Sequence, residues 1–213
     1  MQWNIYSFAL LAADGMIPRM RLQPIIVPGW KDSGPAHWQS LWEQSLPHAV
    51  RVRQQSWSNP HPATWHAAVA AAVDAATCPA LLIAHSLGCL AVASLPVPLH
   101  ARVAGALLVA PADVERGELP DCLKAFAPVP RQPLSFQSVV VVGDDDPYCE
   151  QKRAEEFARD WGSRMVIVPG GGHLNADSGL HDWPAGLKLL ASLRRRACWR
   201  IAAPLPRVPA VPC

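Results

Sequence analysis

The sequence predicts an α/β fold: a doubly wound, mostly parallel sheet of about six strands with helices on both faces. Six short apolar runs recur along the chain, and helix-like segments separate them. The runs are continuously apolar rather than alternating, as in parallel strands that are buried on both faces. Regular alternation of strands and helices favours right-handed crossovers, which place chemistry beyond the carboxyl ends of the strands.

The elements can be assigned in chain order. The expected strands are 24–27, 50–54, 80–84, 103–110, 138–142 and 164–168. The expected helices are 35–44, 63–76, 87–94, 150–161 and 183–194. Pro35 suits a first helical turn, and Ser33 is expected to cap that helix. In the second helix Trp65, Val69 and Val73 form one apolar stripe, which predicts the face that packs on the sheet.

The chain is long enough for one domain with a proper core, since it has 213 residues and half of them are apolar. We expect this domain to span residues 21–196. Residues 1–20 predict a poorly ordered extension rather than a secretory signal, because no Lys or Arg precedes the apolar stretch 5–13. The Pro-rich tail 197–213 predicts irregular structure. The Pro-rich segment 111–133 predicts a connecting loop with one short helix and no large cap domain.

Net charge, hydropathy and the cysteine pattern exclude several classes of partner and cofactor. The formal charge is only +2 and no basic face is evident, so we expect no nucleic-acid partner. No apolar stretch reaches the length of a membrane span, so we expect no membrane association. The six cysteines are scattered without a C-x-x-C pair. They predict reduced thiols, a cytoplasmic location, and neither metal nor organic cofactor.

The segment 81–88 carries the strongest chemical signal. An apolar strand runs into Ser86, and small residues, Ala84 and Gly88, lie two positions before and after it. This A-x-S-x-G pattern is typical of a nucleophile elbow, a tight strand-to-helix turn that exposes one Ser hydroxyl. Alone, the pentapeptide also fits an ordinary strand–loop–helix turn.

Carboxylates follow a later strand. The apolar run 138–142 leads into Asp144, Asp145 and Asp146. In proteins with a nucleophile elbow the triad acid follows the Ser in the chain and the His comes last, so an acid is expected here. Three adjacent Asp residues also fit a solvated turn before a helix, and the residues alone do not choose among them.

A single His follows the next strand. The Gly-rich loop 170–172 carries His173, and its glycines would let the loop reach over the sheet edge towards Ser86. His173 is therefore the expected general base, since a Ser hydroxyl needs a His to take its proton. His85 is less suited to this role because adjacent side chains diverge on a sharp turn.

Acyl transfer also needs donors for an oxyanion. The backbone N–H of Leu87 at the elbow is one expected donor. The second is expected from the loop after the first strand, where Gly29 permits close approach: the Trp30 N–H, with Lys31 as the fallback. The residues expected to border a substrate pocket are Gly29, Trp30, His37, Trp38 and His85.

Together these segments resemble the small α/β-hydrolase family of serine esterases related to retinoblastoma-binding protein 9. The similarity runs from about residue 25 to 193, and its motifs are Val27-Pro28-Gly29-Trp30, Ser33-Gly34-Pro35, His37-Trp38-Gln39, His85-Ser86-Leu87-Gly88, Pro111-Ala112-Asp113, Asp145-Asp146-Pro147-Tyr148, Trp161-Gly162, Gly172-His173-Leu174-Asn175 and Ser178-Gly179. The resemblance implies a compact α/β-hydrolase fold and a Ser86–His173–Asp146 triad, because the family's acid directly precedes a Pro. Asp144 departs from the small residue that is usual there.

The resulting hypothesis is a serine hydrolase that cleaves small carboxylic esters, or related acyl compounds, through an acyl-enzyme. An amidase or aminopeptidase would use the same triad, and the sequence does not separate the two. A non-catalytic protein-binding module on the same scaffold is a further alternative, so a protein partner stays open. A metal hydrolase is disfavoured because no two His show ligand spacing on one helix.

Overall fold

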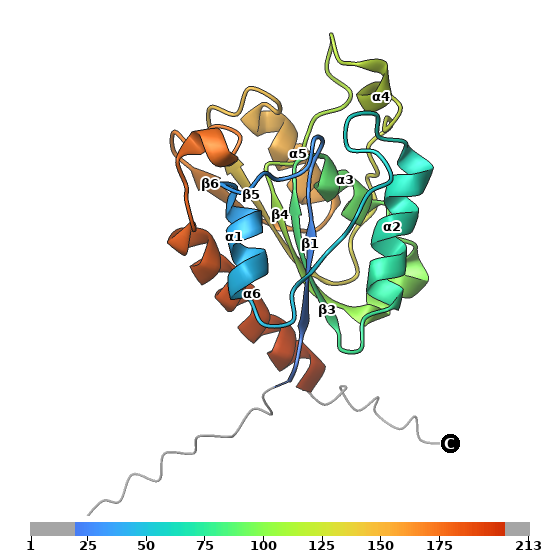
Figure 1. Cartoon of the computed structure of the whole chain (residues 1–213), viewed down its shortest axis with the longest axis vertical. Helices are drawn as coiled ribbons and strands as arrows, with labels where there is room; N and C mark the ends of the chain where they lie inside the picture. The colour runs from blue at the N-terminus through green and yellow to red at the C-terminus, as the bar shows by residue number, and fades with distance from the viewer. Residues whose placement is uncertain (1–19, 203–213) are drawn as a thin grey trace, which may run out of the picture.

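The computed structural model describes residues 20–202. The predictions made for residues 1–19 and 203–213 therefore lie outside the described residues. Within the described range the structure is a three-layer α/β arrangement, with a central sheet and helices on both of its faces (Figure 1).

The sheet has six strands, and all neighbouring pairs are parallel. In the order β2-β1-β3-β4-β5-β6, the strand bounds are β1 (Gln23–Val27), β2 (Val50–Arg51), β3 (Ala80–His85), β4 (Val103–Val109), β5 (Gln137–Gly143) and β6 (Arg164–Val168). From β1 the chain adds β2 on one side and then β3 to β6 on the other, so the strand order reverses once, as in a doubly wound sheet. The predicted fold class is confirmed.

Helices cover both faces of the sheet. Their bounds are α1 (Trp38–Ser45), α2 (Pro62–Asp74), α3 (Leu87–Ala93), α4 (Asp121–Lys124), α5 (Gln151–Asp160) and α6 (Pro184–Ala202), with 3₁₀ turns η1 (Val97–Arg102) and η2 (Ala176–Ser178). Helices α1 and α6 lie on one face, and α2, α3 and α5 on the other (Figure 1). The connection after β4 carries only the four-residue α4, so the described residues contain no large cap domain.

Each face of the sheet has its own apolar core. On the α2 side, Trp65, Val69 and Val73 are fully buried, which confirms the predicted stripe. On the α1 side, Trp38 and Trp42 pack with Trp183. The Trp38 and Trp42 ring centroids lie 4.7 Å apart, and Trp42 stacks on Trp183 at 5.7 Å. These aromatic rings fix α1 to the segment that precedes α6, next to the loop that carries His173.

The first helix begins three residues later than predicted, at Trp38 rather than Pro35. Its cap is His37, whose Nδ1 accepts the backbone N–H of Gln39 at 3.1 Å. The expected Ser33 cap is wrong, because the Ser33 hydroxyl donates to the side-chain oxygen of Gln39 at 2.7 Å instead.

The two largest remaining differences from the predicted bounds are in β2 and α6. The edge strand β2 has two residues, since it has only β1 to pair with and the chain leaves the sheet after Arg51. Helix α6 continues to Ala202, so residues 197–202, expected in the irregular tail, are helical. Ala197 is 1% exposed and extends the packed face, and no proline interrupts the helix before Pro204. No helix in residues 20–202 is long and apolar enough to cross a bilayer.

Candidate active site

Ser86 lies on the tight turn between β3 and α3 at the carboxyl end of the sheet. Its φ is 53° and its ψ is −122°, a strained backbone conformation for a non-glycine residue. The Ser86 N–H donates to the carbonyl of Val109 in β4 at 2.9 Å, which ties the turn to the neighbouring strand. The structure therefore places Ser86 in the strand–turn–helix geometry of a nucleophile elbow.

Gly88 lets α3 start directly against β1. A Cβ at this position would lie 2.4 Å from the Val27 carbonyl oxygen and 2.6 Å from that of Pro28. A methyl group cannot fit there, so the helix would have to move away from the sheet and take Ser86 with it.

Gly88→Ala is therefore expected to lower the free energy of unfolding by about 3 kcal/mol, measured by denaturant titration. The gain in helix propensity has the opposite sign and is smaller, about 1 kcal/mol. Gly34→Ala is the matched control, because nothing lies within 4 Å of a Cβ there. A stable Gly88→Ala variant would contradict the close packing of α3 on β1.

Ser86, His173 and Asp146 form one hydrogen-bonded chain. His173 Nε2 lies 2.9 Å from Ser86 Oγ. His173 Nδ1 lies 2.9 Å and 3.0 Å from the two carboxylate oxygens of Asp146. The side chains of His173 and Asp146 are 9% and 1% exposed. A buried acid, a His and a Ser hydroxyl in this order form the arrangement that can activate the hydroxyl as a nucleophile.

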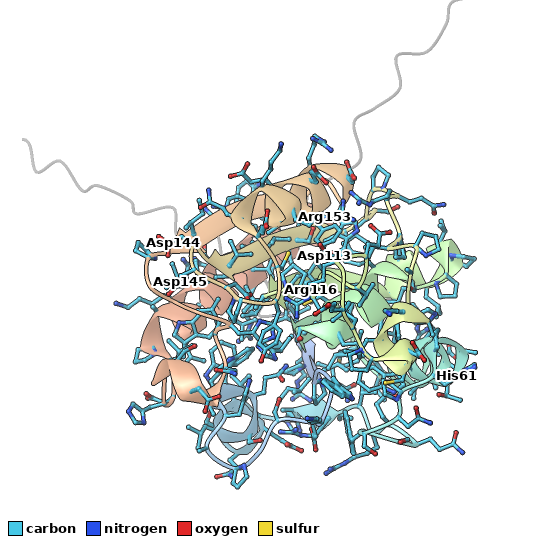
Figure 2. All side chains as sticks on the ribbon, turned by 90° about the horizontal axis from the view of Figure 1, so that it is seen from above. His61, Asp113, Arg116, Asp144, Asp145 and Arg153 are labelled. Atoms are coloured by element: carbon cyan, nitrogen blue, oxygen red, sulfur yellow. The ribbon has the colours of Figure 1, made fainter. Side chains whose placement is uncertain are left out.

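The other two aspartates contact the backbone of the loop that carries His173. Asp144 accepts the N–H of Gly170 at 2.7 Å, and Asp145 accepts that of Gly172 at 2.6 Å. In the view from above, both lie towards the edge of the molecule (Figure 2). Neither has a hydrogen bond to the His173 ring among the described residues. All three carboxylates therefore fix the His loop, but only Asp146 contacts the imidazole.

His85 supports His173 from below. Its Nε2–H donates to the backbone carbonyl of His173 at 2.9 Å. Burial is the main cause that lowers the pKa of His85 well below its usual value, with smaller contributions from His173 and His37. The ring therefore stays neutral, and its protonated Nε2 acts as the donor to this carbonyl. His85 lines the cavity as expected, and it also positions the loop.

Gly29 and Trp38, both expected at the pocket, do not line the cavity. Trp38 instead supports the loop that carries His173. It is 1% exposed, and its Nε1–H donates to the carbonyl of Leu174 at 2.8 Å. His37 does line the cavity. Burial, followed by the charge of Arg51, lowers the pKa of His37 to about 4, so this ring is neutral at physiological pH. Its centroid lies 4.8 Å from that of His85.

The loop after β1 lies directly against Ser86. A Cβ on Gly29 would be 2.8 Å from the Ser86 Cβ, so only glycine permits this approach. Lys31 is excluded as an oxyanion donor because its N–H already donates to the Trp57 carbonyl at 3.0 Å. The N–H groups of Trp30 and Leu87 have no hydrogen-bond acceptor within residues 20–202. These two groups are free to bind an incoming oxygen.

A cavity of about 490 Å³ opens above Ser86. Trp30, His37 and His173 line it, as do residues of the connection after β4. That second wall was not predicted, because its position depends on how the connection folds over the sheet. The wall residues that sequence reasoning missed are Val114, Arg116, Leu119, Leu123 and Tyr148. The sequence signals for this wall are the motif Pro111-Ala112-Asp113 and the position of Tyr148 directly after Asp146-Pro147.

The two buried cysteines do not compete with Ser86 as nucleophiles. Burial raises the pKa of the Cys89 thiol well above its usual value, and it also raises that of Cys149. Both side chains therefore remain protonated thiols, which are poor nucleophiles. No group of three or more His, Cys, Asp or Glu side chains within residues 20–202 is arranged to hold a metal ion.

The chain is similar to one protein family and to several solved structures. The family model for serine hydrolases matches residues 24–192. No curated protein matches the chain. A YdeN-like hydrolase of Pectobacterium atrosepticum is 35% identical, with 83% of this chain and 92% of that chain covered and a TM-score of 0.74. The ydeN gene product of B. subtilis is 18% identical, with 82% and 100% covered and a TM-score of 0.65.

A more distant structure shares the fold alone. Est1E of Butyrivibrio proteoclasticus, solved with bound ferulic acid, is 14% identical, with 87% of this chain and 92% of that chain covered and a TM-score of 0.64. The family match spans most of the chain and includes every segment that contributes to the site. The resemblance drawn from the sequence motifs is confirmed, and the chain belongs to the serine hydrolase family.

Proposed function

We propose that this protein hydrolyses small carboxylic esters through a covalent acyl-enzyme. The observation that carries the proposal is the chain from Ser86 Oγ to His173 Nε2 at 2.9 Å and from His173 Nδ1 to Asp146 at 2.9 Å. In this chain His173 Nε2 can take the proton of the Ser86 hydroxyl, while Asp146 stabilises the charge that the ring then carries. The cavity of about 490 Å³ suits a substrate of modest size.

The first half-reaction forms the acyl-enzyme. Ser86 Oγ attacks the ester carbonyl carbon while His173 Nε2 takes the hydroxyl proton, and Asp146 stabilises the resulting imidazolium. The carbonyl oxygen becomes an oxyanion and accepts hydrogen bonds from the N–H groups of Leu87 and Trp30. Collapse of the tetrahedral intermediate breaks the ester C–O bond, and His173 gives its proton to the departing alcohol oxygen.

The second half-reaction releases the acid. Water attacks the acyl carbon while His173 again takes a proton, and the same two N–H groups bind the oxyanion. Collapse breaks the bond to Ser86 Oγ, which recovers its proton from His173. The carboxylic acid leaves and the free enzyme is restored. No step needs a group beyond water and the residues named.

The test is labelling with a fluorophosphonate probe, which reacts with activated serines, followed by mass spectrometry of the digested protein. The probe is expected to add its phosphonyl group to the peptide that contains Ser86, and the labelled protein should lose hydrolysis of 4-nitrophenyl butyrate. A folded protein that remains unlabelled, or a label on another residue, would contradict the proposal. The matched 4-nitrobutyranilide is expected to react far more slowly, and equal rates would favour an amidase.

A further inference from the structure

Two cations on the cavity wall have no carboxylate partner. Lys31 and Arg116 both line the cavity, and neither forms an ion pair within residues 20–202. Two of the three carboxylates of the wall differ, because each has a cationic partner. Asp32 is paired with Arg51 at 2.7 Å, and Asp113 with Arg153 at 3.5 Å. Both aspartates therefore face an arginine, whereas Lys31 and Arg116 face no carboxylate at ion-pair distance within residues 20–202.

The two cations belong to loops on opposite sides of the strand that ends at Ser86. Strand β3 carries Ser86 at its end and pairs with β1 on one side and with β4 on the other. Lys31 follows β1, and Arg116 belongs to the connection after β4. Loops at the carboxyl ends of neighbouring parallel strands meet at one edge of a sheet. The loops that carry Lys31 and Arg116 therefore flank the end of β3, where Ser86 lies.

Arg116 is held in place yet keeps free donors. Its Nη1 donates to the carbonyl of Pro147, and its guanidinium lies 5.3 Å from the Tyr148 ring centroid. The other N–H groups of its guanidinium have no acceptor within residues 20–202. Asp113, Arg116 and Arg153 gather near the middle of the view from above (Figure 2). Arg153 is saturated by its carboxylate partners, whereas Arg116 beside it is not.

The remaining residues of the cavity wall add apolar surface and two further charges. Tyr148, Leu119 and Leu123 provide apolar surface between the reacting centre and the rim. Lys31 Nζ lies 4.3 Å from the Trp30 ring centroid, which keeps the ammonium beside the cavity. Glu118 is an exposed carboxylate on the same wall and acts against an anionic ligand. Apart from the paired Asp32 and Asp113, the lining therefore carries two cations, Lys31 and Arg116, and one carboxylate, Glu118.

We propose that the preferred substrates are esters that carry a carboxylate, and that Arg116, assisted by Lys31, binds this group. A guanidinium fork with free N–H groups matches the two oxygens of a carboxylate. Arg116 is half-buried, and a partly dehydrated cation interacts more strongly with such a group than a fully hydrated one does. The inference rests on the proposed esterase activity and specifies its substrate class.

The test compares esters that differ in one carboxylate. In the first pair, 4-nitrophenyl hexanoate is compared with mono-4-nitrophenyl adipate, which places the carboxylate on the acyl chain. In the second pair, phenyl hexanoate is compared with 4-carboxyphenyl hexanoate, which places it on the alcohol. The readout is the ratio of kcat/KM for the charged ester to that for the neutral ester. We expect this ratio to favour one of the charged esters by about tenfold and to fall as salt is raised.

Variants separate charge from structure. Arg116→Gln is expected to lower the ratio about tenfold, whereas Arg116→Lys should restore part of it. If Arg116 had a purely structural role, its substitution would instead lower kcat/KM equally for both esters of a pair. Lys31→Gln should lower the ratio, and Glu118→Gln should raise it. Lys188→Gln is the control, since it removes an exposed positive charge outside the cavity.

The outcomes are distinct. A ratio that does not change in Arg116→Gln, for both ester pairs, would overturn the inference while leaving the esterase proposal intact. Absence of hydrolysis for every ester, together with an unlabelled Ser86, would overturn both. An Arg116-dependent preference in either pair supports the inference, and the pair in which it occurs shows whether the acid or the alcohol carries the carboxylate.

Discussion

The Ser86→Ala variant is expected to lose ester hydrolysis, with kcat lowered by about a millionfold, because the triad acts as a unit and its nucleophile is absent. The Ser86 hydroxyl ends the chain of hydrogen bonds, 2.9 Å from His173 Nε2, and is the nucleophile of the proposed reaction. The substitution removes no packing atom other than this oxygen. Loss of activity would therefore report chemistry rather than unfolding, and initial rates with 4-nitrophenyl butyrate measure it.

Ser94→Ala is the matched control. Ser94 caps the same short helix, and its hydroxyl donates to the Leu90 carbonyl at 2.9 Å, away from the reacting centre. Its removal is expected to leave kcat within about twofold of the wild type and to change stability by about 0.5 kcal/mol. Appreciable hydrolysis by Ser86→Ala with unchanged thermal unfolding would show that another group is the nucleophile.

The central strands could be predicted from sequence because burial on both faces leaves a continuous apolar run. β3, β4 and β5 were each placed to within one residue at either end. β2 was not, because an edge strand has one partner and its length depends on where the chain leaves the sheet. The start of α1 was also misplaced, since its cap is a His ring whose position depends on packing against His85.

The site could be predicted where the residues lie at strand ends. Ser86 and His173 come from loops far apart in sequence, yet the shared edge of a parallel sheet brings them within 2.9 Å. The second wall of the cavity could not be predicted, because Arg116 and Leu123 belong to a connection without repeating pattern. The choice between Trp30 and Lys31 as the second oxyanion donor depends on a hydrogen bond between loops, from the Lys31 N–H to the Trp57 carbonyl, which the sequence does not reveal.

The choice among three consecutive aspartates depended on resemblance alone, and it leads to the second large effect. Asp146→Asn is expected to lower kcat about 10⁴-fold, because a neutral amide no longer stabilises the imidazolium and permits the wrong tautomer of His173. The structural role should survive. Asp146 Oδ1 accepts the Tyr148 N–H at 2.8 Å, and the Asn oxygen can keep this bond. Steady-state kinetics and thermal unfolding of the same preparation separate the two roles.

The neighbouring aspartates provide controls of identical chemistry. In Asp144→Asn and Asp145→Asn the side-chain oxygen can still accept the N–H of Gly170 or Gly172, so kcat should fall by no more than about threefold. The three variants differ only in which carboxylate loses its charge. A 10⁴-fold loss confined to Asp146→Asn therefore requires direct contact with the imidazole, since a general loss of negative charge near the His loop would lower all three alike. Equal losses in all three variants would mean that the charge acts on the loop as a whole and that no single aspartate is the triad acid.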